Sequence, residues 1–227
     1  MRYYIIAGEA SGDLHGSNLM KGLYSEDPQA EIRFWGGDLM ESVWSAFRND
    51  LIATDSGLVR HYKEGAVMGF VEVIAKARKL LGNVSFCKKD ILAWNPDVVI
   101  LIDYPGFNFK IAEFAHKAGF KVFYYIAPKV WASREGRIRK LKAYVDKLFI
   151  VFPFEKAYFD SKGISYIYKG NPLVDAVDNS AAMKETRETF LSRNNLENKK
   201  FIALLAGSRK AEINTMMPVL TELAAAM

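Results

Sequence analysis

Short apolar segments alternate with longer amphipathic segments along most of the chain. The apolar segments have the length and the branched and aromatic residues of strands. They are Arg2–Ala7, Glu31–Trp35, Leu51–Ala53, Asp97–Asp103, Phe120–Ile126, Leu148–Phe152 and Ile164–Tyr168. Helices are predicted between them: one ending near Leu23, then Leu39–Phe47, Gly65–Leu81, a segment ending at Trp94, Asn108–Ala118, Ser133–Asp146 and Phe154–Ser161, with Thr54–Glu64 as a loop. This alternation predicts an α/β fold, a Rossmann-like doubly wound parallel sheet.

The pattern changes near residue 174 and predicts two domains. Residues 1–173 form the first domain, and 174–199 are polar and charged, typical of a linker helix. Residues 200–227 begin a second domain with a strand from Phe201, a loop and a helix. One βα unit cannot bury both of its faces, so this second domain is expected to be incomplete.

The loop after the first strand is the first candidate site. Gly8 and Gly12 supply a tight turn, and Ser11 or Asp13 is expected to cap the following helix, with Gly16 letting it lie close to the sheet. Glu9, Ser11 and Asp13 then lie at the carboxyl edge of the sheet, where α/β proteins bind ligands. The loop has neither the dinucleotide fingerprint nor a P-loop, which disfavours a Rossmann-type nucleotide enzyme using it directly.

Two later residues follow strands at the same kind of edge. Asp103 ends the most apolar strand, where it can act as a general base on a sugar hydroxyl or cap the next turn. Arg209, after Gly207 and Ser208, can bind a phosphate oxygen at a helix start or lie in solvent. The pattern alone leaves both alternatives open at each residue.

The helix predicted over Gly65–Leu81 is apolar on more than one side. Its surplus apolar residues face acyl chains and a membrane surface, or a second packed layer. They are Val67, Met68, Phe70, Val71 and Ile74. The basic helix Ser133–Asp146 is either a solvated face or a surface for phosphate or lipid headgroups.

Composition narrows the class of protein. The chain has 227 residues, half of them hydrophobic, with a net charge of +5 and one cysteine, Cys87, so no internal disulfide forms. No apolar run approaches the roughly 20 residues of a membrane span, and no signal peptide opens the chain. We find no spacing for a metal site and no nucleic-acid-binding module. We therefore expect a cytoplasmic protein without a metal or other cofactor and without a nucleic-acid partner.

Several segments together resemble one family. They are Gly8–Asp13, Ile102–Asn108, Pro128–Ala132, Pro153–Glu155, Gly170–Leu173 and Gly207–Glu212. In this order and spacing the chain resembles lipid-A-disaccharide synthase, an inverting glycosyltransferase of the GT-B fold. The resemblance implies transfer of 2,3-diacylglucosamine from UDP to the 6-hydroxyl of 2,3-diacylglucosamine 1-phosphate. The products are the β-1,6 tetraacyl disaccharide 1-phosphate and UDP.

The resemblance also implies roles for particular residues. Asp103 matches an essential aspartate, and Arg209 matches an essential arginine that offsets charge on the departing diphosphate. Substrate contacts are implied for Glu9, Ser11, Asp13, Asn108, Trp131 and Ser208. The implied location is peripheral, on the inner face of the inner membrane, with the apolar helix toward acyl chains. A homo-oligomer is a further state that the sequence allows.

The chain also departs from the family pattern. Gly106, Ala206 and Ser133 stand where members commonly have aspartate, proline and tryptophan. Members also continue through most of a second domain, which in GT-B enzymes holds most of the nucleotide site. The alternative function is therefore a non-catalytic lipid- or membrane-binding fragment without a donor site.

Overall fold

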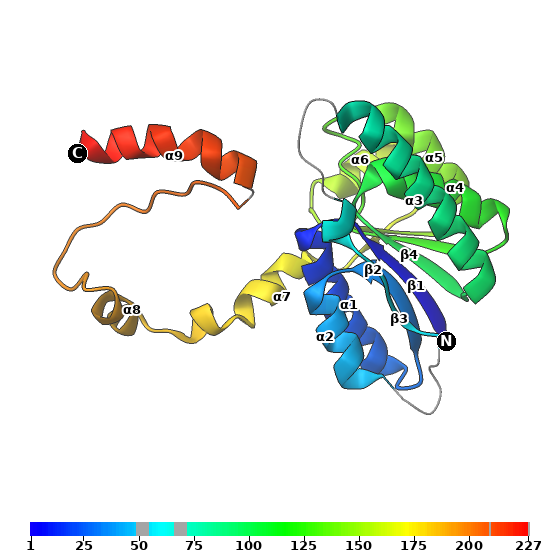
Figure 1. Cartoon of the computed structure of the whole chain (residues 1–227), viewed down its shortest axis with the longest axis horizontal. Helices are drawn as coiled ribbons and strands as arrows, with labels where there is room; N and C mark the ends of the chain where they lie inside the picture. Colours follow the sequence, from blue (N-terminus) through cyan, green and yellow to red (C-terminus); the bar gives the residue numbers. More distant parts are fainter. Residues whose placement is uncertain (49–54, 66–71, 209, 227) are drawn as a thin grey trace. The chain divides into compact units, whose positions relative to one another are not determined.

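The computed structural model describes residues 1–48, 55–65, 72–208 and 210–226 (Figure 1). Two compact units, Met1–Val177 and Asp178–Met227, divide the chain close to the boundary predicted at residue 173. The strand predicted at Leu51–Ala53 lies outside the described residues.

The first unit is built on one parallel sheet. Its described strands are β1 (Arg2–Ala7), β2 (Glu31–Gly36), β3 (Gly57–His61), β4 (Val98–Ile102), β5 (Lys121–Tyr125), β6 (Lys147–Ile150) and β7 (Ile167–Tyr168). They lie in the order β3-β2-β1-β4-β5-β6-β7, and every neighbouring pair is parallel. The predicted doubly wound fold is confirmed. Its strand order reverses between β1 and β4, the point at which α/β sheets bind ligands.

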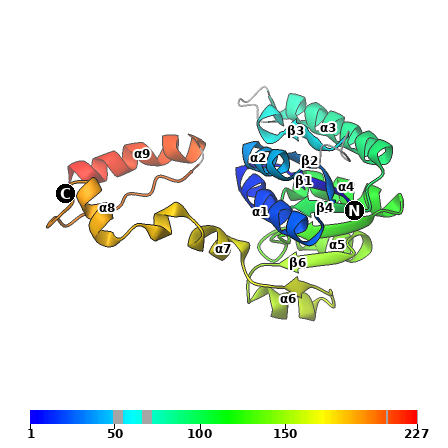
Figure 2. The same cartoon turned by 90° about the horizontal axis from the view of Figure 1, so that it is seen from below.

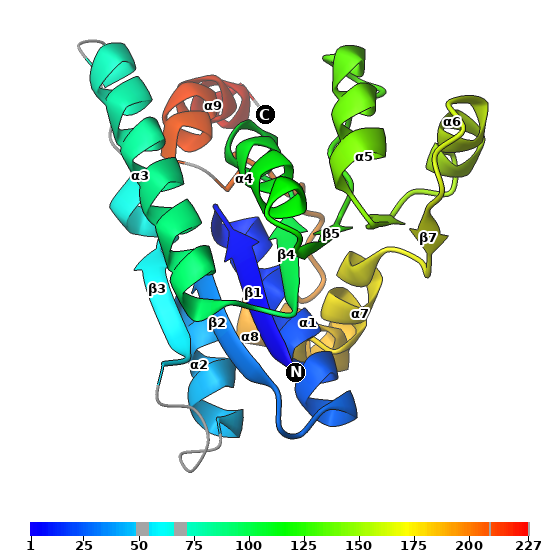
Figure 3. The same cartoon turned by 90° about the vertical axis from the view of Figure 1, so that its right-hand side faces the viewer.

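Helices cover both faces of this sheet (Figures 1 and 3). The helices of the first unit are α1 (Ala10–Glu26), α2 (Asp38–Phe47), α3 (Glu72–Trp94), α4 (Pro105–Lys117), α5 (Ile138–Tyr144) and α6 (Glu155–Ser161), with short 3₁₀ turns η1 (Tyr62–Gly65) and η2 (Glu135–Arg137). The helix α7 (Pro172–Asp178) follows β7. Figure 2 shows the same arrangement from below.

The sheet has a hydrophobic core on each face, and the alternation of side chains along β1 explains why. Tyr4 and Ile6 pack with residues of α3, α4 and α5, whereas Ile5 and Ala7 pack with residues of α1 and α2. Successive side chains of a strand point to opposite faces, so a central strand must be apolar throughout. This is why β1 and β4 have the clearest strand sequences.

Two predicted segments around α3 were wrong. The predicted loop Thr54–Glu64 contains β3, which pairs with β2 through a shift in register near Trp35. The helix predicted to end at Leu81 and the one ending at Trp94 are one continuous helix, α3. Gly82 lies within it and only weakens the helical signal, since a helix tolerates a glycine at a cost of about 1 kcal/mol.

A polar network attaches α3 to the sheet. Asp90 of α3 accepts hydrogen bonds from Arg33 Nε and Nη2, at 2.9 and 2.6 Å, and from the Tyr4 hydroxyl at 2.6 Å. Trp35 Nε1 donates to that same hydroxyl at 2.9 Å. Because these groups are largely shielded from water, their mutual hydrogen bonds help to fix the position of α3 along β1 and β2.

The second unit contains η3 (Ala181–Lys184), α8 (Arg187–Arg193) and α9 (Lys210–Ala225). The helix α9 forms where a helix was predicted. The strand predicted from Phe201 does not form: residues 201–208 have no strand in the described part of the chain. A strand needs a neighbour for its N–H and C=O groups, and this unit offers none among its described residues. Leu205 is 84% exposed accordingly.

Candidate functional site at the carboxyl edge of the sheet

The turn that follows β4 is held in an uncommon conformation. Asp103 and Tyr104 have φ angles of +41° and +44°, in the left-handed region that non-glycine residues seldom adopt. The Asp103 carbonyl oxygen accepts hydrogen bonds from Asn108 Nδ2 at 2.8 Å and from the Tyr124 hydroxyl at 2.7 Å. Such backbone strain persists where neighbouring groups over-determine it, and it occurs often at functional sites.

Asn108 therefore serves the turn. Its side chain is fully buried, and Nδ2 also donates to the Ile102 carbonyl oxygen at 3.2 Å. We assign Asn108 a positioning role in place of the substrate contact predicted from the sequence. A buried amide that bonds to backbone carbonyls holds Asp103 in place and has no surface left for a ligand.

The Asp103 carboxyl group lies half-buried at the β1/β4 reversal, close to Glu9. Burial, and then the negative charge of Glu9, raise the pKa of Asp103, while Lys129 opposes this shift. A carboxylate with a raised pKa is a stronger base and is better suited to take a proton near neutral pH. The sequence placed Asp103 at this edge, and the fold brings Glu9 and Lys129 to it.

The loop after β1 differs in detail from the prediction. The helix α1 begins at Ala10 with Glu9 as its N-cap residue, and no side chain caps it, so neither Ser11 nor Asp13 does so. Ser11 is exposed at the edge and Glu9 is partly exposed there. Gly16 approaches α2 instead of the sheet, because a Cβ there would meet Met40 Sδ at 2.5 Å.

Asp13 has a structural role that the sequence did not reveal. Its side chain is buried, and its carboxylate accepts hydrogen bonds from the backbone N–H groups of Gly37, Leu39 and Met40 at 2.8, 3.1 and 3.1 Å. These are amides at the start of α2, which have no partner within their own helix. Asp13 therefore caps α2 from a neighbouring helix, and this replaces the predicted substrate contact.

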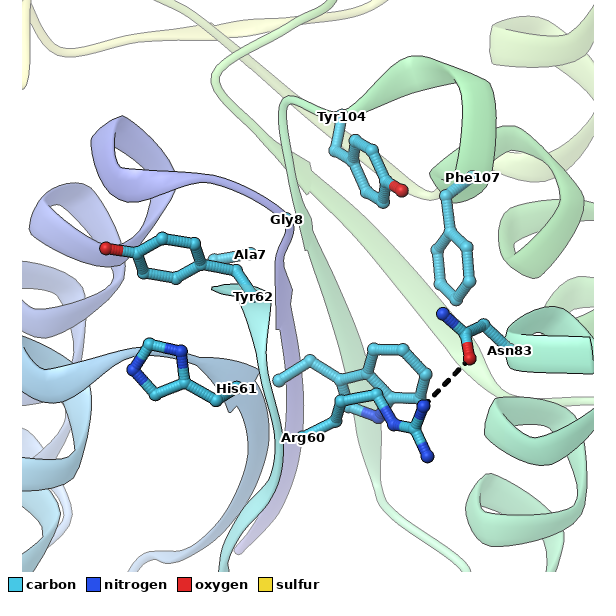
Figure 4. Close-up of a pocket in the computed structure, with 9 residues that line it drawn as sticks. Ala7, Gly8, Arg60, His61, Tyr62, Asn83, Tyr104 and Phe107 are labelled. Atoms are coloured by element: carbon cyan, nitrogen blue, oxygen red, sulfur yellow. Dashed lines mark hydrogen bonds between the residues drawn. The ribbon is translucent and has the colours of Figure 1, made fainter. Parts of the chain in front are cut away.

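A cavity opens beside this turn (Figure 4). It is partly open to solvent, and its walls come from β1, β2, β3, η1, α3 and α4. The lining residues are Ala7, Gly8, Trp35, Arg60, His61, Tyr62, Asn83, Tyr104 and Phe107. Sequence reasoning missed Arg60, His61 and Asn83, because it treated 54–64 as a loop and could not bring α3 to β3.

Trp131 lies on a second part of the same edge and is held by a buried carboxylate. Glu155 is fully buried and accepts hydrogen bonds from Trp131 Nε1 at 3.0 Å and from the backbone N–H groups of Val151 and Phe152 at 3.0 and 2.9 Å. The Trp131 ring stays 37% exposed and packs edge-on against Phe154, with ring centroids 4.9 Å apart. Glu155 thus orients a predicted substrate-binding residue.

Other predicted residues lie where the structure adds less. Arg209, Val67, Met68, Phe70 and Val71 lie outside the described residues, as does the side chain of Ile74. In the second unit Ser208 is exposed, and its backbone N–H donates to Glu212 at 3.1 Å. The basic helix is divided into η2 and α5, and its N-cap residue is Arg134, with φ +56°, instead of Ser133.

Two kinds of feature are absent from the described residues, a metal-ion cluster and a membrane-spanning helix. No group of three or more His, Cys, Asp and Glu side chains in that part of the chain has the geometry to hold a metal ion. Among the helices described above, none has both the length and the hydropathy needed to cross a bilayer.

Curated relatives match nearly the whole of this chain. It is 39% identical over 220 residues to the lipid-A-disaccharide synthase of Syntrophus aciditrophicus, which covers 97% of this chain and 54% of that protein. The enzyme of the same name from Coxiella burnetii is 36% identical over 220 residues, or 96% of this chain and 54% of that protein. The chain therefore spans about half the length of these curated relatives.

Solved structures show the same fold at low identity. The UDP-GlcNAc 2-epimerase of Neisseria meningitidis, bound to UDP-GlcNAc, matches 86% of this chain and 53% of its own with a TM-score of 0.57 and 13% identity. The Methanocaldococcus jannaschii epimerase, in complex with UDP-GlcNAc and UDP, matches 86% of this chain and 54% of its own with a TM-score of 0.56 and 17% identity.

The family model described as lipid-A-disaccharide synthetase matches residues 3–227, nearly the whole chain. This match agrees with the relatives, with the GT-B-type half-fold and with the order of the motifs along the chain. The chain therefore belongs to the lipid-A-disaccharide synthetase family.

Proposed function

We propose that this chain is the acceptor-side part of a glycosyltransferase that makes the lipid A disaccharide. The donor is UDP-2,3-diacylglucosamine and the acceptor is 2,3-diacylglucosamine 1-phosphate. The 6-hydroxyl oxygen of the acceptor forms a bond to the anomeric carbon of the donor, and the bond from that carbon to UDP breaks. The products are the β-1,6 tetraacyl disaccharide 1-phosphate and UDP, and no metal or other cofactor takes part.

The observation that carries the proposal is the strained turn at Asp103. Its carboxylate lies at the reversal point of the sheet, and burial together with Glu9 raises its pKa. In the proposed reaction Asp103 takes the proton of the 6-hydroxyl as that oxygen attacks. UDP leaves with the electron pair of the broken bond, and Arg209 is proposed to offset the charge on its diphosphate.

We further propose that the protein works as a peripheral protein on the inner face of the inner membrane. Both proposed substrates carry two acyl chains, so the enzyme must meet them at a lipid surface. The apolar segment containing Val67, Met68 and Phe70 is the proposed contact. Replacing these three residues with serine should weaken binding to anionic vesicles, and unchanged binding would remove the segment from this role.

A second candidate rests on the length of the match. Because the chain spans about half of its curated relatives, it can instead bind the acceptor lipid without transferring a sugar to it. This fragment would keep the edge around Asp103 and lack the donor site.

The two candidates predict different products. The chain alone, and the chain fused to the remaining half of the Syntrophus aciditrophicus relative, would be incubated in detergent with UDP-2,3-diacylglucosamine and the monophosphate acceptor. Mass spectrometry of the lipids would then detect a tetraacyl disaccharide phosphate. Product from the fusion alone favours the binding fragment, and product from the chain alone favours a chain that transfers the sugar by itself. No product from either contradicts the proposed reaction.

Asp103→Asn in the active form tests the proposed base. An amide has nearly the same shape and cannot take the proton, so turnover should fall by at least 100-fold, within the roughly 10²–10⁴-fold contribution of a general base. Unchanged turnover would refute the role. The matched control is Asp97→Asn at the opposite, amino end of β4.

A further inference from the structure

The cavity beside Asp103 contains an arginine that no part of the proposed reaction uses. Arg60 lies near the carboxyl end of β3, and its Nη1 donates to Asn83 Oδ1 of α3 at 2.9 Å. The guanidinium carbon lies 5.6 Å from the ring centroid of Trp35 and 5.2 Å from that of Phe86. Arg60 thus lies near two neighbouring aromatic rings and is hydrogen-bonded to an amide.

The Arg60 guanidinium has N–H groups that are not used in the described hydrogen bonds. Its Nε is buried and has no hydrogen-bond partner among the described residues. The Glu64 carboxylate is 4.0 Å from that atom, but its side chain is 59% exposed, so water screens the pair. A guanidinium has five N–H donors, and the described contacts account for few of them.

Aromatic rings form much of the remaining wall of the cavity. In Figure 4 the rings of Tyr104 and Phe107 and the guanidinium of Arg60 surround one space, while His61 and Tyr62 lie at its opposite side. Tyr104 and Phe107 are stacked with ring centroids 5.4 Å apart, and Trp35 and Phe107 are 5.3 Å apart. Aromatic walls lower the polarity around the guanidinium, which strengthens its attraction to a phosphate.

The cavity lies next to Asp103, the proposed base. Tyr104 is the residue after Asp103, and Arg60 lies across the cavity on β3. A sugar whose hydroxyl meets Asp103 at one end can therefore direct a second group toward Arg60. The proposed acceptor has such a shape, because its ring carries the reacting 6-hydroxyl and, at the anomeric carbon, a phosphate monoester.

We propose that Arg60, held by Asn83, Trp35 and Phe86, is an anion subsite that binds the sugar 1-phosphate of the acceptor. This inference rests on the proposed function for the identity of the ligand. The guanidinium is proposed only to bind the phosphate monoester and takes no part in the bond-making step. A binding experiment can therefore test it separately from catalysis.

The test uses the 227-residue chain and water-soluble probes. Affinities for glucosamine 1-phosphate, N-acetylglucosamine, inorganic phosphate and UDP would be measured by NMR titration. The variants are Arg60→Gln, Arg60→Lys and Asn83→Ala. Arg2→Gln is the matched control, because Arg2 also lies over a tryptophan ring, Trp94 at 4.4 Å, but at the amino end of β1.

The subsite predicts a definite order of affinities. Glucosamine 1-phosphate should bind at least tenfold more weakly to Arg60→Gln, since about 1.5–3 kcal/mol for a charged hydrogen bond corresponds to roughly 10–100-fold. Arg60→Lys should lose less, and Asn83→Ala should lose several-fold because Arg60 is no longer held. Arg2→Gln should bind as the unchanged chain does, and N-acetylglucosamine should not distinguish the variants.

Several results would overturn the proposal. One is equal binding of glucosamine 1-phosphate to Arg60→Gln, with its tryptophan fluorescence unchanged as evidence of folding. If inorganic phosphate binds as tightly as the sugar phosphate, the site is for a free anion. If UDP binds more tightly than the sugar phosphate and depends on Arg60, the site belongs to the donor.

The subsite and the proposed function can fail separately. Binding of glucosamine 1-phosphate that depends on Arg60, with no disaccharide product from the chain or its fusion, contradicts the reaction and leaves the subsite supported. Product formed by Arg60→Gln with an unchanged KM for the acceptor contradicts the subsite and leaves the reaction supported.

Discussion

Replacing Asp13 with alanine removes the acceptor for three backbone N–H groups at the start of α2. Two of them, those of Gly37 and Met40, make buried hydrogen bonds to Oδ1, and the third, from Leu39, is partly buried and reaches Oδ2. A buried amide that loses its partner costs about 1–3 kcal/mol. With water able to reach Leu39, two amides at the lower half of that range give a loss of about 3 kcal/mol in the free energy of unfolding.

Asparagine at the same position should cost much less. Its single carbonyl oxygen can take the place of Oδ1 and keep the two buried bonds, so only the bond from Leu39 and the charge near the helix start are lost. We expect a cost of about 1 kcal/mol. Asp38→Ala is the matched control, because Asp38 is in the first turn of α2 but is 69% exposed and pairs with Lys63 at the surface.

Urea titration followed by tryptophan fluorescence measures these differences. All four tryptophans of the chain lie before residue 178, so the signal reports the first unit. With a dependence of about 2 kcal/mol per molar urea, Asp13→Ala should lower the midpoint by about 1.5 M and Asp13→Asn by about 0.5 M. Asp38→Ala should change it little. An unchanged midpoint for Asp13→Ala would refute the capping role and return Asp13 to the candidate substrate contacts.

Three further predictions follow from other contacts. Burial raises the pKa of Asp103, so ionisation of this carboxyl opposes folding at neutral pH, and this cost disappears below about pH 4. Asp103→Asn should therefore have a higher urea midpoint than the unchanged chain at pH 7, and the difference should close toward pH 4. A difference in midpoint that does not depend on pH would contradict this reasoning. Glu155→Gln places an amide N–H₂ group, which cannot accept a hydrogen bond, opposite at least one of the three N–H donors, so we expect a loss of about 1–3 kcal/mol and faster acrylamide quenching of Trp131, whereas quenching equal to that of the unchanged chain would show that Glu155 does not hold this ring. Gly106→Ala in the first turn of α4 meets open space, so it should stabilise the chain by about 0.4–1 kcal/mol in the same urea titration, and a loss would mean that the turn at Asp103 needs glycine there.

Much of the fold is determined by local sequence. The strands β1 and β4 are apolar on both faces and are bounded by turn residues, so their type and their carboxyl ends can be read from the chain. Because the carboxyl ends of parallel strands lie along one edge of the sheet, the sequence also placed both Glu9 and Asp103 at that edge. Motif order was enough to indicate the family.

Other features depend on contacts between distant segments, which local patterns do not contain. The strand β3 was read as a loop, because its residues are only partly buried and its pairing with β2 shifts register. Asp13 and Asn108 were read as ligand contacts, because a polar residue after a strand has the same pattern whether it faces a substrate or a backbone amide. Only packing decides between the two.

The sequence by itself determined the α/β class, the position of most strands along the chain and the aspartate at the carboxyl end of a strand, since these follow from hydrophobic periodicity and chain direction. The tertiary structure decided which side chains surround that aspartate. It brought Arg60 and Asn83, 23 residues apart, into one cavity, and it used Asp13, Asn108 and Glu155 to hold the loops of the edge. The reason is physical: a buried polar group takes whatever partner the packing of distant elements supplies.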